Sequence, residues 1–281
     1  MDLPIPITLV RRRPSSPLAG MVAGLVGLSE RSLEPVTRRQ PAGTLIPLVI
    51  SFGSQLTIDQ LSDGVGANRS YGSFVAGLSP GHATTSHPGD QDCVQVYLTP
   101  LGVRRVLGVP GSELARRVVA IDDVARELGE DLAARVAGAA TWPDRLRLVE
   151  AALTARLGST PGPPDWVQGM WHELATSGGR ASIGGLVART GWSHRYVATR
   201  FREEVGLTPK EAAGVLRFER AAAGLGRLPL ADLAVRCGYA DQSHLTRDVV
   251  RRAGEPPQAL AAAQRPTAYT ALGDRADGLQ R

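Results

Sequence analysis

The C-terminal third of this 281-residue chain contains one local pattern twice, and this repeat constrains the fold more than any other feature. Each copy has a short apolar segment, a glycine, an aromatic residue, a capping residue and then a segment rich in polar side chains. The copies cover residues 186–201 and 233–248, and their glycines, Gly191 and Gly238, lie 47 residues apart. Two short helices joined by a tight glycine turn form a helix-turn-helix unit. The repeat therefore predicts two such units in one helical domain.

Local sequence signals define the first unit further. Ser182 and Ser193 are candidate N-caps of its two helices, because a serine hydroxyl can accept a hydrogen bond from an unpaired backbone N–H. Gly191 lies between them, and we expect it to form the turn with a positive φ. Apolar residues spaced three and four apart predict the buried side of the second helix, which is Val197, Phe201 and Val205.

The second unit follows a long connecting helix. Thr208 and Pro209 provide that helix with a capping residue and a first-turn proline. Asp241 is then expected to cap the last helix of the second unit, whose buried side contains Leu245 and Val249.

The outer faces of both second helices are polar once the buried positions are assigned. Such a face suits DNA recognition, because side chains near the helix N-terminus reach base edges and cations reach phosphates. Gln can pair with adenine, Arg can pair with guanine, and Thr can contact a thymine methyl group. The candidate DNA-binding residues are Ser193, His194, Arg195, Ala198, Thr199 and Arg202 in the first unit, and Asp241, Gln242, Ser243, Thr246 and Arg247 in the second.

The distribution of charge along the chain agrees with a polyanionic partner. Residues 1–179 contain 16 basic and 17 acidic residues, for a net charge of −1, whereas residues 180–265 contain 14 and 8, for a net charge of +6. The whole positive excess of the chain therefore lies in the segment that contains the repeat. A basic segment of this kind is typical of nucleic-acid-binding domains.

The remainder of the chain predicts an α+β fold. Short apolar runs over residues 44–51, 71–78 and 93–98 are separated by clusters of glycine, proline and aspartate, which favours a barrel, a cupin-like barrel or a sandwich. Helical periodicity follows, including one amphipathic helix expected over residues 122–140. We expect a flexible segment at 1–17, a sensing or dimerisation domain at 18–160 that is β-rich to about residue 98, a DNA-binding domain at 161–264 and a disordered tail at 265–281.

The second unit carries a resemblance to a known family. Residues 237–247, followed by Gly254 and Pro257, are similar to the signature of the AraC/XylS family of bacterial transcription regulators, and the likeness extends over residues 170–264. It implies two recognition helices in successive major grooves, about 34 Å apart on one face of the DNA. Apolar residues smaller than the family's usual aromatics stand at Leu245, Val249 and Leu260, so we expect the first unit to be better packed and the second to be softer.

The N-terminal part resembles the β-rich domains that accompany this DNA-binding domain in actinobacterial regulators. That resemblance rests on residues 73–78 and 94–102. It implies that residues 18–160 sense a small-molecule effector or form a homodimer. The implied partners are double-stranded promoter DNA and RNA polymerase, in the cytoplasm and without a membrane. Residues 18–28 are the most apolar stretch and are about half the roughly 20 residues that a membrane span needs. We interpret them as a buried strand instead of a signal peptide, because no small-x-small cleavage pattern follows them.

An alternative function rests on His82 and His87, which lie near Asp90 and Asp92. These residues could bind a metal in a β-barrel enzyme or in a metal sensor fused to a DNA-binding domain. Zinc and iron sites usually need three or four convergent ligands, and we expect a solvated loop here. The chain contains no nucleophile motif, no phosphate-binding loop and no dinucleotide fingerprint, so we predict no enzyme activity, no cofactor, no catalytic residue and no metal. Its two cysteines are expected to be buried thiols.

Overall fold

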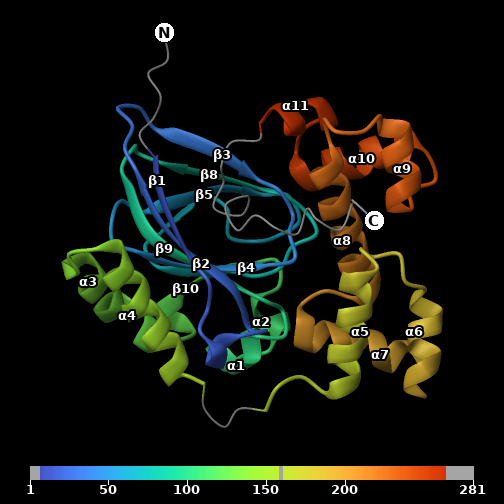
Figure 1. The fold of residues 1–281 in the computed structure, drawn as a ribbon, viewed down its shortest axis with the longest axis horizontal. Helices are drawn as coiled ribbons and strands as arrows, with labels where there is room; N and C mark the ends of the chain where they lie inside the picture. The colour runs from blue at the N-terminus through green and yellow to red at the C-terminus, as the bar shows by residue number, and fades with distance from the viewer. Residues whose placement is uncertain (1–6, 158–160, 264–281) are drawn as a thin grey trace.

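The computed structural model describes residues 7–157 and 161–263. It contains a β-rich domain followed by a region made entirely of helices (Figure 1). This arrangement confirms the predicted α+β fold class, with two antiparallel sheets in the first domain and two helix-turn-helix units in the second. Within the described residues, no helix has both the length and the apolar character needed to cross a membrane.

Two antiparallel sheets form the β-rich domain. The larger sheet has six strands in the order β1-β2-β9-β4-β7-β10, and the smaller has four in the order β3-β8-β5-β6. The strands are β1 (Ile7–Arg12), β2 (Val22–Glu30), β3 (Val36–Gln40), β4 (Ile46–Ser51), β5 (Leu56–Leu61), β6 (Arg69–Tyr71), β7 (Phe74–Ala76), β8 (Ala83–His87), β9 (Gln91–Leu98) and β10 (Val118–Ala120).

The larger sheet is buried on both faces, and its side chains divide between two cores with the two-residue period of a strand. Leu25, Leu48 and Val94 belong to the main core, which also contains the helices of the domain. Leu28 and Cys93 belong to a second core together with residues of the smaller sheet, such as Ile58. The stretch at residues 18–28 is therefore largely a buried strand, as predicted.

The helices that follow cover one face of the larger sheet. They are α1 (Val103–Leu107), α2 (Gly111–Leu114), α3 (Glu130–Gly138) and α4 (Trp142–Ala155). Gly27 of β2 allows the closest approach, because a β-carbon at this position would overlap the ring of Trp142 in α4. Burial confirms the predicted inner side of α4, where Leu146, Val149 and Leu153 are each at most 2% exposed.

Two sequence-based expectations for this domain were wrong. Residues 122–140 do not form one helix: two 3-10 turns, Ile121–Asp123 and Arg126–Leu128, precede α3, and Gly129 between them and α3 has a non-helical ψ of −137°. The spacing of the apolar residues correctly indicated that one side of this segment is buried, but it did not reveal that the helix is interrupted. The segment 1–17 is also not wholly flexible, because β1 pairs with β2 along its full length.

Seven helices form the rest of the described chain. They are α5 (Asp165–Thr176), α6 (Ile183–Thr190), α7 (His194–Val205), α8 (Pro209–Gly224), α9 (Leu230–Cys237), α10 (Gln242–Ala253) and α11 (Pro257–Ala262). Helices α6 and α7 form the first unit, α9 and α10 form the second, and α8 connects them (Figure 1). The expected domain boundary near residue 160 and the tail at 265–281 lie outside the described residues.

The β-rich domain packs directly against the first unit. Gly111 at the start of α2 lies against the end of α7, and a β-carbon at position 111 would lie 2.5 Å from the carbonyl oxygen of Glu204. Gly206, with a φ of +92°, ends α7 at the same place, and a β-carbon there would lie 2.9 Å from the carbonyl oxygen of Gly111. Backbone therefore meets backbone between the two domains.

This close approach leads to a prediction about stability. Gly111→Ala should lower the free energy of unfolding of the whole chain by about 1–3 kcal/mol, because the added methyl group must separate α2 from α7. The matched control is Gly169→Ala in α5, where a β-carbon would meet nothing within 4 Å. That change should instead raise stability by about 0.5–1 kcal/mol, as expected for alanine in a helix. Urea unfolding of both variants gives the comparison, and equal stability of the two would contradict the assigned contact.

Candidate nucleic-acid interface

The first unit has the local geometry that its sequence predicts. The hydroxyl of Ser182 accepts a hydrogen bond from the backbone N–H of Gly185 at 3.2 Å, and the hydroxyl of Ser193 accepts one from Tyr196 at 3.3 Å. Gly191 joins the two helices with a φ of +73°. The predicted inner side of α7 is buried, since Val197, Phe201 and Val205 are at most 1% exposed. These contacts determine which side of α7 faces solvent.

The candidate reading face of α7 is open to solvent. Ser193, His194, Arg195, Thr199 and Arg202 are exposed, and Ala198 is half-buried. Among the described residues, neither Arg195 nor Arg202 forms a salt bridge with a carboxylate. Their guanidinium groups are therefore free to contact bases or phosphates, which remains a prediction for each residue.

The second unit presents a similar face. Asp241 caps α10 by accepting a hydrogen bond from the N–H of His244 at 2.7 Å, and Gly238 forms the turn with a φ of +77°. Gln242, Ser243 and Arg247 are exposed, while Thr246 is half-buried. Because its carboxylate is engaged in the cap, Asp241 is better suited to holding the start of α10 than to contacting a base.

A polar network completes the interior of the second unit. Leu245 and Val249 are fully buried, and beside them the Tyr239 hydroxyl donates to Asp248 at 2.9 Å. The Arg252 guanidinium donates to the same carboxylate, also at 2.9 Å. Burial on its own would raise the pKa of Asp248, but Arg252 and the Tyr239 hydroxyl outweigh that effect and hold the pKa below its ordinary value. An ionised carboxylate therefore helps to hold α10 at neutral pH.

Acidic side chains of the helical region gather where it meets the β-rich domain. Four of the eight acidic residues between positions 180 and 265 make contacts there. The pairs are Glu204 with Arg104, Glu211 with Arg116, Glu255 with Arg39, and Glu219 with the backbone and hydroxyl of Thr44. Half of the acidic residues of this region are thus held against the β-rich domain, and this distribution favours approach of a polyanion to the reading faces.

The β-rich domain contacts the second unit as well. The backbone N–H of Ala42 donates to the carbonyl of Arg252 at 2.8 Å, and the Arg252 guanidinium donates to the carbonyl of Pro80 at 3.0 Å. The ring of His82 lies against Gly254, where a β-carbon would be 2.7 Å from it. Sequence reasoning did not find these contacts, because they join positions about 170 to 210 residues apart and no local pattern marks them.

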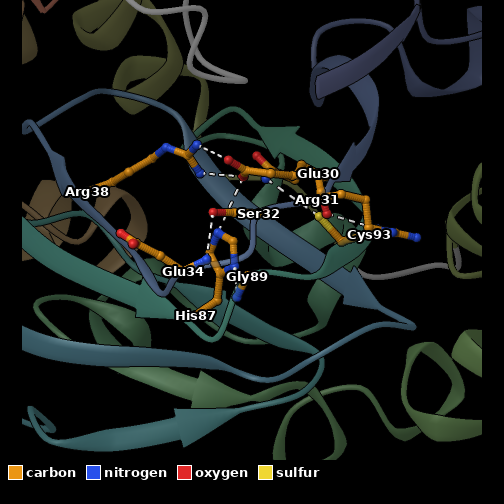
Figure 2. A network of polar contacts seen from close by, with 9 residues as sticks. Glu30, Arg31, Ser32, Glu34, Arg38, His87, Gly89 and Cys93 are labelled. Carbon is orange, nitrogen blue, oxygen red and sulfur yellow. Dashed lines mark hydrogen bonds and ion pairs between the residues drawn. The ribbon is translucent and has the colours of Figure 1, made fainter. Parts of the chain in front are cut away.

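The structure does not assemble the metal site considered for His82 and His87. His82 lies at the domain interface, whereas His87 is 4% exposed inside the β-rich domain (Figure 2). There it is beside the buried carboxylate of Glu30, which also pairs with Arg38. Burial lowers the pKa of His87, so the ring is neutral at pH 7. No cluster of three or more His, Cys, Asp or Glu side chains able to hold a metal occurs within residues 7–157 and 161–263.

An aromatic cluster lies beside the reading face of α7. The rings of Trp192 and Tyr196 are 4.9 Å apart between centroids, and Trp166 of α5 lies 6.4 Å from Tyr196. Both Trp192 and Tyr196 are about half exposed. Tyr196 and Trp166 line a hollow of about 510 Å³ together with Thr199 and Arg200. The sequence offers one signal for this surface, which is the helical spacing of four between Tyr196 and Arg200.

Comparison with known proteins identifies the helical region. Residues 186–263 match a family model described as a helix-turn-helix domain. This segment of the chain is therefore a helix-turn-helix domain, as the repeat predicts. The match begins in α6 and ends just after α11, so it contains both units and the connecting helix. The matched segment contains the residues that resemble the signature of the AraC/XylS family. No curated protein matches the chain.

Several solved structures are similar to this chain at low identity. The C-terminal domain of AraT, a response regulator from Geobacillus stearothermophilus, is 20% identical over 38% of this chain and 93% of that chain, with a TM-score of 0.34. ToxT from Vibrio cholerae is 8% identical over 91% and 97%, with a TM-score of 0.46. The AraC-like transcriptional activator CuxR is 13% identical over 74% and 78%, with a TM-score of 0.29.

The left-handed turn of the second unit leads to a further prediction. Gly238→Val should lower the melting temperature and weaken DNA binding, because a β-branched residue at a φ of +77° costs about 1–3 kcal/mol. Gly238→Asn is the matched control, since asparagine tolerates this conformation better than other residues with a side chain. Thermal unfolding and a gel-shift titration measure both effects. If the valine variant equals the asparagine variant in both assays, the conformational assignment is wrong.

Proposed function

We propose that this chain is an AraC-type transcription regulator that reads a specific promoter sequence with both helix-turn-helix units at once. Residues 161–264 bind the DNA, and residues 18–160 respond to a small-molecule effector or pair two copies of the chain. The first recognition helix contacts bases or phosphates of one major groove through Arg195, Thr199 and Arg202. The second makes such contacts in the next major groove through Gln242, Ser243, Thr246 and Arg247. The regulator acts in the cytoplasm on double-stranded promoter DNA, where RNA polymerase is a further partner.

One observation supports this proposal best. The β-rich domain contacts both helix-turn-helix units, and both reading faces remain exposed to solvent. Its contacts with the first unit run through Gly111 and Arg104, and those with the second run through Ala42 and Pro80. Within the described residues, no hydrogen bond or salt bridge joins these four residues to a candidate reading residue. The β-rich domain is therefore placed to set the distance and angle between the two recognition helices without competing with DNA.

This arrangement also offers a route for control by an effector. Two recognition helices can occupy successive major grooves only if their separation matches one helical turn of DNA, which is about 34 Å. A ligand or a second copy of the chain that shifts the β-rich domain would change that separation. The affinity for the promoter would then change even though no reading residue is covered.

Hydroxyl-radical footprinting on the chain's own upstream region tests the two-groove mode. We expect two protected segments with centres about 10 base pairs apart, as two recognition helices on one DNA face require. A scrambled fragment of the same length should show no discrete protection at the same salt concentration. A single protected segment, or equal protection of both fragments, would refute sequence-specific reading by two units.

Arg195 tests the reading role at residue level. Arg195→Ala should weaken binding to the promoter site by about 1–3 kcal/mol while changing binding to random DNA less, because a lost base contact affects one sequence selectively. The control is Arg189→Ala in α6, where the arginine is exposed and already paired with Glu173. An equal loss on both DNAs would assign Arg195 to a phosphate contact.

A further inference from the structure

Three arginines converge at the junction between the two helix-turn-helix units. Arg217 and Arg220 belong to α8, and Arg180 belongs to the connection between α5 and α6. The Arg217 guanidinium lies 5.8 Å from the centre of the Tyr239 ring, in the turn of the second unit. Arg180 lies against Gly238 in the same turn, where a β-carbon would be 3.4 Å from its side chain. Burial raises the pKa of the Cys237 thiol, which precedes Gly238, while the charges of Arg220 and Arg180 act in the opposite sense. All three arginines therefore lie near the turn of the second unit.

A pair of glycines places these arginines together. Gly178 and Gly179 have φ values of +59° and +74° and bring the α5–α6 connection onto α8 (Figure 1). A β-carbon at Gly179 would overlap the carbonyl oxygen of Ala213, and one at Gly178 would lie 2.9 Å from the side chain of Arg220. No other residue type allows so close a contact in that conformation. The chain is therefore built to hold Arg180 beside the two arginines of α8.

The cluster has no counter-charge of its own. Within residues 7–157 and 161–263, no salt bridge joins Arg180, Arg217 or Arg220 to a carboxylate. The Nε atoms of Arg217 and Arg220 are buried and have no hydrogen-bond partner. Arg180 donates only to the carbonyl of Ser177 in its own loop, at 3.1 Å. Arg217 and Arg220 are half-buried, and Arg180 beside them is exposed. Partly buried cations that have no anion cost folding free energy, so their convergence with a third arginine points to an anionic ligand.

The position of the cluster indicates which anion it meets. Two recognition helices in successive major grooves on one DNA face leave a minor groove between them, and its phosphates face the middle of the protein. Arg180 lies two residues before the N-cap of α6, and Gly238 lies three residues before the N-cap of α10. The first helix of such a unit crosses the DNA backbone. The junction therefore meets the phosphates between the two half-sites.

We propose that Arg180, Arg217 and Arg220 form a binding site for backbone phosphates of the DNA between the two major grooves. The site rests on the proposed function, because it requires both units to engage one DNA duplex. It contacts no base and is therefore indifferent to sequence. It adds affinity and fixes the register of the two units on the duplex.

The salt dependence of DNA binding tests this site in the full chain. The variants are Arg180→Gln, Arg217→Gln, Arg220→Gln and the triple substitution, titrated by fluorescence anisotropy with a duplex of mixed sequence. Each lost phosphate contact should make the slope of log K against log salt shallower by about 0.9. The loss of affinity between about 50 and about 200 mM salt should then be about 3-fold smaller than in the wild type. The affinities for promoter and mixed DNA should fall by the same factor. An unchanged slope in the triple variant would overturn the proposal.

Two control variants distinguish loss of this phosphate site from misfolding and from the loss of any one positive charge. Arg189→Gln removes an arginine already paired with Glu173 and should leave the slope unchanged; a decrease equal to that of the junction variants would count against a specific site. The triple lysine variant keeps the charge and should restore most of the slope, with a melting temperature close to that of the wild type. Failure of lysine to restore the slope in a folded protein would also overturn the proposal.

The three arginines could instead bind a free phosphate ion, which has the same chemistry as a DNA phosphate. Inorganic phosphate at fixed ionic strength would raise the melting temperature of the wild type but not of the triple glutamine variant if the cluster bound a free anion. That result together with an unchanged DNA slope would assign the site to a free anion and overturn the DNA assignment. The proposed function fails separately, because it requires wild-type discrimination between promoter and scrambled DNA, which this site does not supply.

Discussion

The contact between α2 and the end of α7 is the constraint on which the rest of the arrangement depends. At this point two backbones approach with only glycine between them, at Gly111 and Gly206. Glu204 beside them is 1% exposed, and its carboxylate accepts from Arg104 of the β-rich domain at 2.8 Å. A carboxylate can be buried to this extent only if it is paired. The first unit is thus held by steric fit and by charge at the same place.

The second unit is held by a different set of interactions that share one residue. Arg252 is 3% exposed, and its guanidinium joins Asp248 in α10 to the carbonyl of Pro80 in the β-rich domain. A β-carbon at Gly214 of α8 would overlap that guanidinium, so the connecting helix closes around it. One side chain therefore links the recognition helix, the connecting helix and the other domain. This linkage couples the position of α10 to the β-rich domain.

Charge separation follows from these contacts. Four acidic residues of the helical region contact the β-rich domain, whereas Arg195, Arg202 and Arg247 on the reading faces form no salt bridge within the described part of the chain. The net charge of each sequence segment identifies the basic segment. It does not reveal that half of the acidic side chains of the helical region lie against the β-rich domain. The expectation that the second unit is the softer one remains a prediction. Leu245 and Val249 are smaller than the family's usual aromatics, yet they are fully buried beside a polar network that the sequence pattern did not indicate.

The sequence by itself determined the features that depend on neighbours in the chain. Caps at Ser193 and Asp241, a left-handed glycine at position 191 and the buried side of α7 all follow from spacings of three or four residues, and the structure confirms each. Only the tertiary structure decided how the two units are held, where His82 and His87 point, and which arginines gather at the junction. Those contacts join residues far apart in the chain, and burial and pairing across such distances leave no periodic signal in a single sequence.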